Sequence, residues 1–317
     1  MKKSRWVAIG MLIVVIVAIA ALFAVERPEL GAPTVIGITQ ELGKITESES
    51  VILTNVAVKN PNPVSIGLES VEAEVFMNDE KMGEMSSVSS TEIKANQVSI
   101  LKLSTKIDNH KIRGWWVSHI KNGERTEVRV RMNLILDLGL TKHEYPIEFT
   151  NSLTTDILSD FNSIPEGLEG VYLGPVQLKL NSMNSRFSDV TEDETEIITS
   201  IVVNNSEPIP ISLSEYYYEI VMNEVTIGAG RVKANDTLAP NSATTISFIT
   251  PLQNDKIGEW WVSHLKNGER TAVKLKIQPV AEITGKRYEC PPIEWGGEFK
   301  TSILSALAEE TIFNNFL

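Results

Sequence analysis

Two histidines are the residues of this chain best placed to carry chemistry. His119 and His264 each follow a Trp-Trp pair by three residues. A histidine in such a setting could act as a general base or bind a metal ion through an imidazole nitrogen. Each one, however, lies on the apolar stripe of a predicted helix. That position favours a hydrogen-bonded core or boundary histidine over a catalytic one.

The rest of the sequence contains no recognisable catalytic apparatus. His110 and His143 have Asp255 and Tyr288 at the equivalent positions of the repeat described below, so neither histidine is retained. No His/Cys/Asp cluster has the spacing of a metal site. A Gly-x-Ser-x-Gly elbow, a Walker loop and a dinucleotide fingerprint are all absent from the sequence. We therefore predict a protein that is not an enzyme and that uses no cofactor or metal.

Two acidic stretches, residues 47–49 and 192–196, precede equivalent strands. Their carboxylates could bind calcium, but they lack the Asp-x-Asp-x-Asp-Gly loop pattern, which favours solvated loops. Asn204 and Asn235 each begin an Asn-x-Ser/Thr glycosylation sequence. Only Asn235 is expected to be clearly accessible, because Asn204 lies at a predicted strand end.

An internal repeat positions both histidines. Residues 107–126 and 252–271 are near-copies separated by a constant shift of 145 positions. The repeat predicts two homologous modules of that length. A residue of one module that carries function can therefore be compared with the residue at the equivalent position of the other module. Within the repeat, twelve of the fourteen residues from Trp115 to Val128 are identical in the second copy.

Some of these identities lie off the predicted apolar stripe, at Val117, Ser118, Lys121, Glu124 and Arg125. A recent duplication with uneven divergence explains them. The alternative is that the helix and the following turn form a contact surface, used between the modules or toward an external partner or lipid. The residues of this candidate contact surface are Lys121, Glu124, Arg125, Lys266, Glu269 and Arg270.

The elements that carry these residues follow from hydrophobic periodicity. A spacing of i, i+3, i+4, i+7 and i+8 from Ile112 and from Ile257 predicts one amphipathic helix per module. Asp108-Asn109 and Asn254-Asp255 are the expected N-caps, and Asn122-Gly123 and Asn267-Gly268 the expected ends.

Alternating strands fill most of the remaining chain. One strand from Val51 to Lys59 runs into the turn Asn60, Pro61, Asn62 and Pro63. A second strand ends in Asn78-Asp79, a hairpin signal that Asn223-Glu224 repeats. The fold class is therefore mainly β, with two tandem antiparallel β-sandwich domains that each carry one helix. We place the domains at 30–161 and 176–317, and a Gly- and Pro-rich linker at 162–175.

The N-terminal segment is predicted to be a membrane anchor. Residues 1–5 form a basic flank, and residues 6–25 are uncharged and long enough to cross a bilayer as a helix. The positive-inside rule keeps the flank in the cytoplasm and places both domains outside, on a single-pass protein of the cell membrane. A cleaved signal peptide, which would release a secreted protein, is the alternative, because small residues lie near its end.

The net negative charge of the chain argues against nucleic acid as a partner. Without the three basic residues of 1–25, the chain keeps 26 basic and 41 acidic residues, a net charge of −15. Such a surface repels nucleic acid and anionic lipid headgroups, and it favours hydration. Cys290 is the only cysteine, so no intrachain disulfide can form and each domain must be held by its core.

The strand VILTNVAVKN, its Asn-Pro-Asn-Pro turn and the hairpin from Val71 to Gly83 resemble the type-2 late embryogenesis abundant family, also called the water stress and hypersensitive response domain. The resemblance covers about 110 residues of the first module. It is weaker in the second, where Asn205-Ser206-Glu207-Pro208 has one proline fewer. It implies a fibronectin-type-III-like sandwich with a helix, no catalytic residues, and an association with desiccation, osmotic stress and membrane-tethered defence proteins.

Two classes of function follow. The first is a non-enzymatic stress protein whose acidic surface retains water and protects the membrane or proteins during drying. The second is a membrane-tethered binding module for a protein partner, or for an apolar lipid tail held between sheet and helix.

Overall fold

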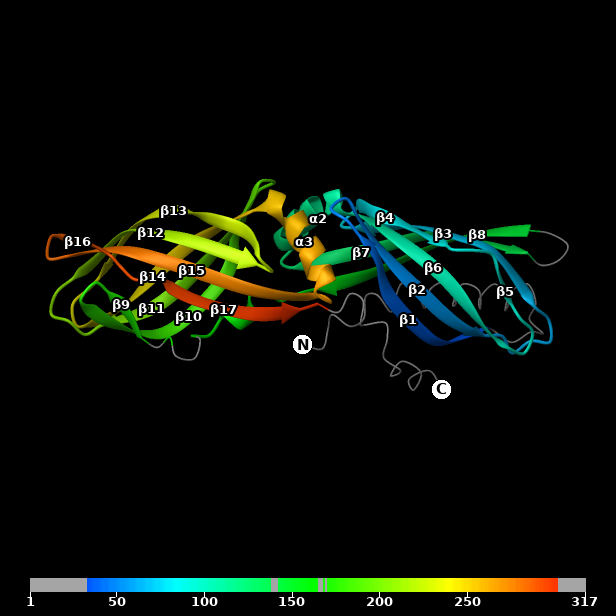
Figure 1. Ribbon diagram of the computed structural model, residues 1–317, viewed down its shortest axis with the longest axis horizontal. Helices are drawn as coiled ribbons and strands as arrows, with labels where there is room; N and C mark the ends of the chain where they lie inside the picture. Colours follow the sequence, from blue (N-terminus) through cyan, green and yellow to red (C-terminus); the bar gives the residue numbers. More distant parts are fainter. Residues whose placement is uncertain (1–32, 138–141, 165–167, 169, 302–317) are drawn as a thin grey trace. The chain divides into compact units, whose positions relative to one another are not determined.

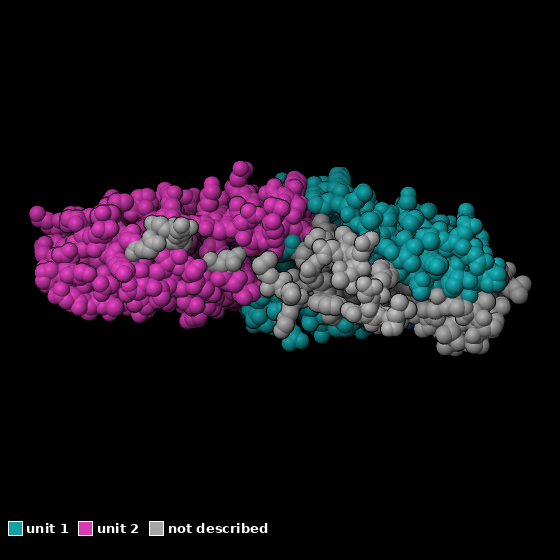
Figure 2. Space-filling view, turned by 90° about the horizontal axis from the view of Figure 1, so that it is seen from below, with its two compact units in different colours: residues 1–155, 301–317 teal, residues 156–300 magenta. Residues whose placement is uncertain are grey.

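The structure is a computed structural model that describes residues 33–137, 142–164, 168 and 170–301. It divides into two compact units, residues 1–155 with 301–317 and residues 156–300 (Figure 2). The described part is mainly strand, and each unit carries one helix (Figure 1). This confirms the predicted mainly β class.

In the first unit, the described residues form one antiparallel sheet of eight strands that encloses a core. The strand order is β1-β2-β6-β4-β3-β7-β8, with β5 paired to β3. Buried side chains of β2, β6, β3 and β7 meet in a single cluster. The bounds are β1 (Thr34–Ile45), β2 (Glu49–Lys59), β3 (Ile66–Met77), β4 (Glu80–Ser87), β5 (Thr91–Ile93), β6 (Val98–Asp108), a 3-10 turn η2 (Asn109–Lys111), α2 (Ile112–Lys121), β7 (Arg125–Asp137) and β8 (Lys142–Thr154).

In the second unit, the described strands form two antiparallel sheets, β14-β11-β10-β9 and β13-β12-β15-β16 with β17 paired to β15. The bounds are η3 (Ser159–Phe161), β9 (Gly170–Leu173), β10 (Val176–Val190), β11 (Glu194–Asn205), β12 (Ile211–Met222), β13 (Val225–Leu238), β14 (Ser242–Gln253), η4 (Asn254–Lys256), α3 (Ile257–Lys266), β15 (Arg270–Ile283), β16 (Lys286–Glu289) and β17 (Ile293–Lys300). Strand β9 lies within the segment predicted as a linker, because its residues pair in register with the start of β10.

The hairpin signals are confirmed. Asn78 and Asp79 both have positive φ, 49° and 66°, and join β3 directly to β4. Asn223 and Glu224 repeat this geometry with φ of 49° and 69°. Two left-handed central residues are what a two-residue hairpin turn needs to match the twist of its strands.

The predicted helices are also present, but one predicted cap is wrong. Asp108 caps η2, because its carboxylate accepts from the His110 amide at 3.0 Å. In the second unit, the start of η4 has no side-chain cap. The Asn254 side chain instead bonds the Thr191 and Glu192 carbonyls and accepts from the Thr195 hydroxyl. Gly123 ends α2 as expected, with φ of 66°.

A close approach of strands explains the glycine that follows each hairpin. A Cβ on Gly83 would lie 1.9 Å from the Lys106 carbonyl oxygen, and one on Gly228 would lie 2.3 Å from that of Pro251. We expect Gly83→Ala to lower the free energy of unfolding by about 1–3 kcal/mol, because the backbone must move apart. Gly114→Ala in α2 is the control: it meets no atom within 4 Å, so urea unfolding should show a gain of roughly 0.5–1 kcal/mol.

The predicted anchor at 6–25 lies outside the described residues. Within the described part of the chain, no helix has the length and apolar character needed to cross a membrane.

Candidate functional site

The helix of the first unit is held to the sheet by a buried hydrogen-bonded network. Trp115 and His119 are 6% and 0% exposed, and both contact Thr126 of β7. The Thr126 hydroxyl accepts from Trp115 Nε1 at 2.9 Å and lies 2.7 Å from His119 Nδ1. One threonine therefore satisfies two ring nitrogens on successive turns of α2.

The contact of His119 Nε2 determines which ring nitrogen carries the proton. Its Nε2 lies 2.8 Å from the Thr155 hydroxyl, which donates to Glu124 Oε1 at 3.0 Å. Because that hydroxyl has one proton, it can only accept from His119. The neutral imidazole thus carries its proton on Nε2, and Nδ1 accepts from Thr126. The result is a directed chain from Trp115 through Thr126, His119 and Thr155 to Glu124.

The second unit repeats the first half of this network. Thr271 accepts from Trp260 Nε1 at 2.9 Å and lies 2.7 Å from His264 Nδ1. The His264 ring also stacks on Phe299 of β17, with ring centroids 5.9 Å apart. Thr301 follows the residue paired with Arg270, just as Thr155 follows the residue paired with Arg125.

The environment of both histidines opposes acid–base catalysis near neutral pH. Burial lowers the pKa of His119 to about 4. Burial also lowers the pKa of His264 to about 4, although a hydrogen bond with the Arg270 backbone acts in the opposite direction. Each ring is fully buried. Among the described residues, no group of three His, Cys, Asp or Glu side chains could hold a metal ion. The burial and the hydrogen bonds of the two rings are those of packing groups.

Several of the retained identities have a structural reason that the sequence pattern did not reveal. Val117 is 8% exposed and belongs to the core. The Ser118 hydroxyl donates to the Trp115 carbonyl at 2.8 Å and accepts from Asn78 at 2.9 Å. Glu124 adopts φ of 59° and receives the Thr155 hydrogen bond.

The residues of the candidate contact surface differ in their exposure. Its four cations, Lys121, Arg125, Lys266 and Arg270, are exposed. Glu269 is only 4% exposed, with φ of 58°, and its amide donates to the His264 carbonyl at 2.9 Å. We expect charge reversal of the four cations to leave the melting temperature unchanged. If they form a partner surface, that variant loses partner binding; unchanged binding would reject the surface.

The turn at residues 60–63 is organised by its first asparagine. The Asn60 amide donates to the Val64 and Ile93 carbonyls at 2.8 and 3.1 Å, and its oxygen accepts from the Asn62 amide. Pro61 and Pro63 are exposed.

The second unit keeps this asparagine arrangement. Asn205 donates to the Ile209 carbonyl and accepts from the Glu207 amide. The asparagine therefore explains why the turn survives in the second unit with one proline fewer.

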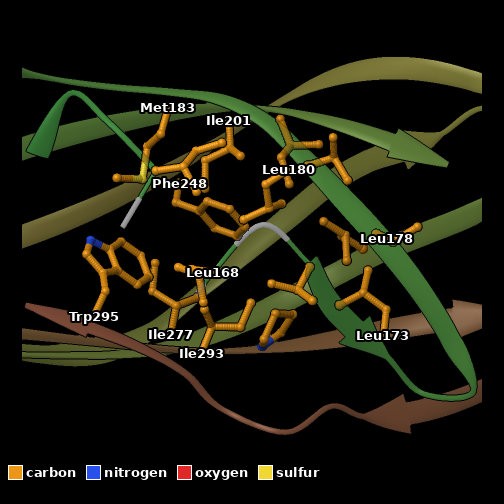
Figure 3. Close-up of a pocket in the computed structure, with 16 residues that line it drawn as sticks. Leu168, Leu173, Leu178, Leu180, Met183, Ile201, Phe248, Ile277, Ile293 and Trp295 are labelled. Carbon is orange, nitrogen blue, oxygen red and sulfur yellow. The ribbon is translucent and has the colours of Figure 1, made fainter. Parts of the chain in front are cut away.

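The second unit also contains an apolar cavity, which lies between its two sheets (Figure 3). Leu178, Leu180 and Met183 of β10 face Ile277 of β15 and Trp295 of β17 across it. The volume is about 30 Å³, and no polar atom lines it. The lining also includes Ile164, Leu168, Val171, Leu173, Ile201, Val203, Leu213, Ile246, Phe248, Pro279 and Ile293. Helix α3 contributes no residue to this set, so the space differs from the predicted one between sheet and helix.

Trp295 lines the cavity with apolar atoms only, and its ring nitrogen, which is not exposed in the cavity, lacks a hydrogen-bond partner in the structure. The Trp295 side chain is largely buried. A buried indole N–H normally finds an acceptor.

A buried carboxylate in the second unit was not foreseen. Glu215 is 4% exposed, and both Arg231 and Arg287 donate to it. Burial raises the pKa of Glu215, but the two guanidinium groups outweigh it and hold the pKa below its ordinary value. Ser70 occupies the equivalent position of the first unit, so this ion triad is specific to the second. The three residues of the triad come from three strands, β12, β13 and β16, and their separation in the sequence gives no local pattern that predicts the cluster.

The two glycosylation sequences lie on different kinds of surface. Asn235 is exposed on β13. Asn204 is half-buried, and its amide bonds the Ser206 hydroxyl at 3.1 Å.

Similarity to solved structures is partial. A crystal structure of a protein from Archaeoglobus fulgidus is 36% identical, covering 39% of this chain and 98% of the other, with a TM-score of 0.37. A solution structure of an Arabidopsis thaliana protein is 20% identical, covering 46% and 89%, with a TM-score of 0.31. A β-glucuronidase of glycoside hydrolase family 2 is 12% identical over 78% of this chain and 24% of its own, with a TM-score of 0.23.

No curated protein matches the chain significantly. The family comparison does give a match, to the late embryogenesis abundant protein family LEA_2 over residues 55–151. This range contains the Asn60 turn, the Asn78-Asp79 hairpin, α2 and its Trp-Thr-His network. The chain therefore carries a LEA_2 domain of the late embryogenesis abundant protein family in its first unit.

Proposed function

We propose that this protein is a non-enzymatic, membrane-anchored component of the desiccation and water-stress response, with both units outside the cytoplasm. The LEA_2 match is the observation that carries the proposal, since this is a non-catalytic family linked to desiccation and stress. The uncharged segment 6–25 behind a basic flank supports the anchor.

The proposed protective agent is the hydrated acidic surface. The chain beyond residue 25 has a net charge of −15, and its carboxylates lie largely on strand faces directed to solvent. Charged groups keep water at a surface and keep proteins apart when volume shrinks. Such an effect needs no binding pocket and no catalytic residue.

Extraction of membranes tests the anchor. An uncleaved anchor predicts that detergent, and not high salt, releases the protein, and that mass spectrometry of the mature N-terminus finds residues 1–25 in place. Release by salt, or a mature chain that begins after residue 25, would contradict the anchored form and support the secreted one.

The cavity of the second unit favours a second candidate, a binding module for an apolar ligand. A lipid chain would enter only if the side chains around the space moved apart, because the space is only about 30 Å³ and apolar atoms alone line it. For this candidate, native mass spectrometry with palmitate should show one ligand per chain, and Ile201→Phe should remove it by filling the cavity. An absence of stoichiometric ligand on the unsubstituted chain would reject the candidate.

A further inference from the structure

The first unit exposes a band of large apolar side chains on the face of its sheet that lies away from the core. Ile36 is 44% exposed, Val98 48%, Ile100 47% and Val88 60%. Single exposed apolar residues are ordinary, but a contiguous group marks an interaction site.

The strand register makes this group contiguous. Ile100 of β6 pairs with Ala57 of β2, which pairs with Gly37 of β1, and Ile36 is the bulged residue beside Gly37. Val98 lies two residues from Ile100 on the same face of β6. Paired side chains in an antiparallel sheet lie about 5 Å apart, and only the small residues Ala57 and Gly37 lie between Ile100 and Ile36.

Val88, the residue that follows β4, joins the band. Its amide donates to the Lys102 carbonyl at 2.9 Å, which continues the pairing of Ser87 with Leu103. Lys102 points outward, two residues from Ile100. The outer band is therefore defined by Ile36, Val88, Val98 and Ile100.

The second unit is a control supplied by the same chain. At the four equivalent positions it has Asn181, Lys233, Ala243 and Thr245, all exposed. Asn181 occupies the same bulge in β10 that Ile36 occupies in β1. The same kind of fold thus forms without these apolar groups, so packing does not require them in the first unit.

Two cations accompany the band. Lys59, which pairs with Val98, and Lys102 are both exposed on this face. Their equivalents in the second unit are the uncharged Asn204 and Ser247. Apolar side chains flanked by lysines suit the boundary between lipid headgroups and acyl chains, where lysine stems lie along the apolar region and the amines meet phosphate.

The position of the band along the chain selects its partner. Strand β1 begins at Thr34, only nine residues after Val25, the last residue of the uncharged segment. Nine residues span at most about 30 Å. Thr34 pairs with Lys59, so the chain enters the unit at the end of the sheet where Ile36 and Val98 lie.

We propose that the outer band of the first unit lies against the surface of the membrane that holds residues 6–25. This inference rests on the proposed anchor. It assigns the two units different tasks: the first contacts the lipid surface, and the second does not present such a band.

An environment-sensitive fluorophore on an introduced cysteine tests this directly. Asn55→Cys places the label on β2 beside the band, where Asn55 pairs with Lys102, and Ser200→Cys places it at the equivalent position of β11. Cys290 is 1% exposed, so labelling goes to the introduced cysteine. The labelled full chains are reconstituted into vesicles of phosphatidylcholine and phosphatidylglycerol that contain nitroxide-labelled lipid, and then floated.

We expect lipid quenching of the Asn55→Cys label to exceed that of the Ser200→Cys label several-fold. Exchanging the band for its counterparts (Ile36→Asn, Val88→Lys, Val98→Ala, Ile100→Thr) should remove the difference while circular dichroism stays unchanged. Equal quenching in chains that float, or a difference that survives the exchange, would overturn the band alone. Chains that do not float with the vesicles would overturn the anchor and the band together.

Discussion

Replacing Thr126 with valine is expected to lower the free energy of unfolding by about 2–6 kcal/mol. The substitution keeps the shape of the side chain but removes the hydroxyl that Trp115 Nε1 and His119 Nδ1 share, at 2.9 and 2.7 Å. Both ring nitrogens then remain buried without a partner, at a cost of about 1–3 kcal/mol each. Urea unfolding followed by tryptophan fluorescence measures the loss.

Thr126→Ser is the matched control, because it keeps the hydroxyl and should recover most of the stability. Thr271→Val should produce a similar loss through Trp260 and His264. A Thr126→Val protein within 0.5 kcal/mol of the unsubstituted chain would show that the network contributes little to stability.

Mild acid is expected to destabilise the protein through the same histidines. Each has an ordinary pKa of 6.5 when unfolded and a pKa of about 4 when folded, because burial opposes the charged ring. Between these values the unfolded chain binds more protons, so the free energy of unfolding falls as pH falls. The loss per histidine should be about 2 kcal/mol by pH 5 and approach about 3 kcal/mol near pH 4.

Above pH 4.5, the change in the free energy of unfolding comes from the histidines and not from the carboxylates. Glu215 and Glu84 also have lowered pKa values, but their ordinary value is 4.5, so their contribution is lost only in stronger acid. Urea unfolding at pH 7 and pH 5 measures the effect. His119→Gln should be less stable at pH 7 and should lose about half of the change between the two pH values. A stability independent of pH in this window would contradict the neutral buried histidines.

The sequence predicts local structure well where residues close together in the chain determine it. The spacing from Ile112 and Ile257 predicts both helices, and Asn78-Asp79 and Asn223-Glu224 predict both hairpin turns. The cap at Asn254 was wrong because a contact with a distant loop took its side chain. Strand β9 was hidden because its Gly- and Pro-rich surroundings resemble a linker.

The candidate site depends on contacts that periodicity does not contain. The stripe placed His119 and Trp115 inside, but Thr126 and Thr155 complete their network from other elements. Glu124 was predicted as a contact residue because it lies outside the stripe, but in the structure it accepts a hydrogen bond from Thr155. The sequence does not predict the outer band, because its members come from β1, from β6 and from the residue after β4, and they meet only through the strand register.

Dye retention by vesicles after drying and rehydration tests the central claim most directly. Vesicles carrying the full chain in their membrane are compared with vesicles carrying an anchor peptide of residues 1–25. Protection by the hydrated surface predicts that retention rises steadily with the number of chains per vesicle and that no ligand is consumed or released. Retention equal to that of the anchor peptide, or protection that saturates at one bound lipid per chain, would contradict it.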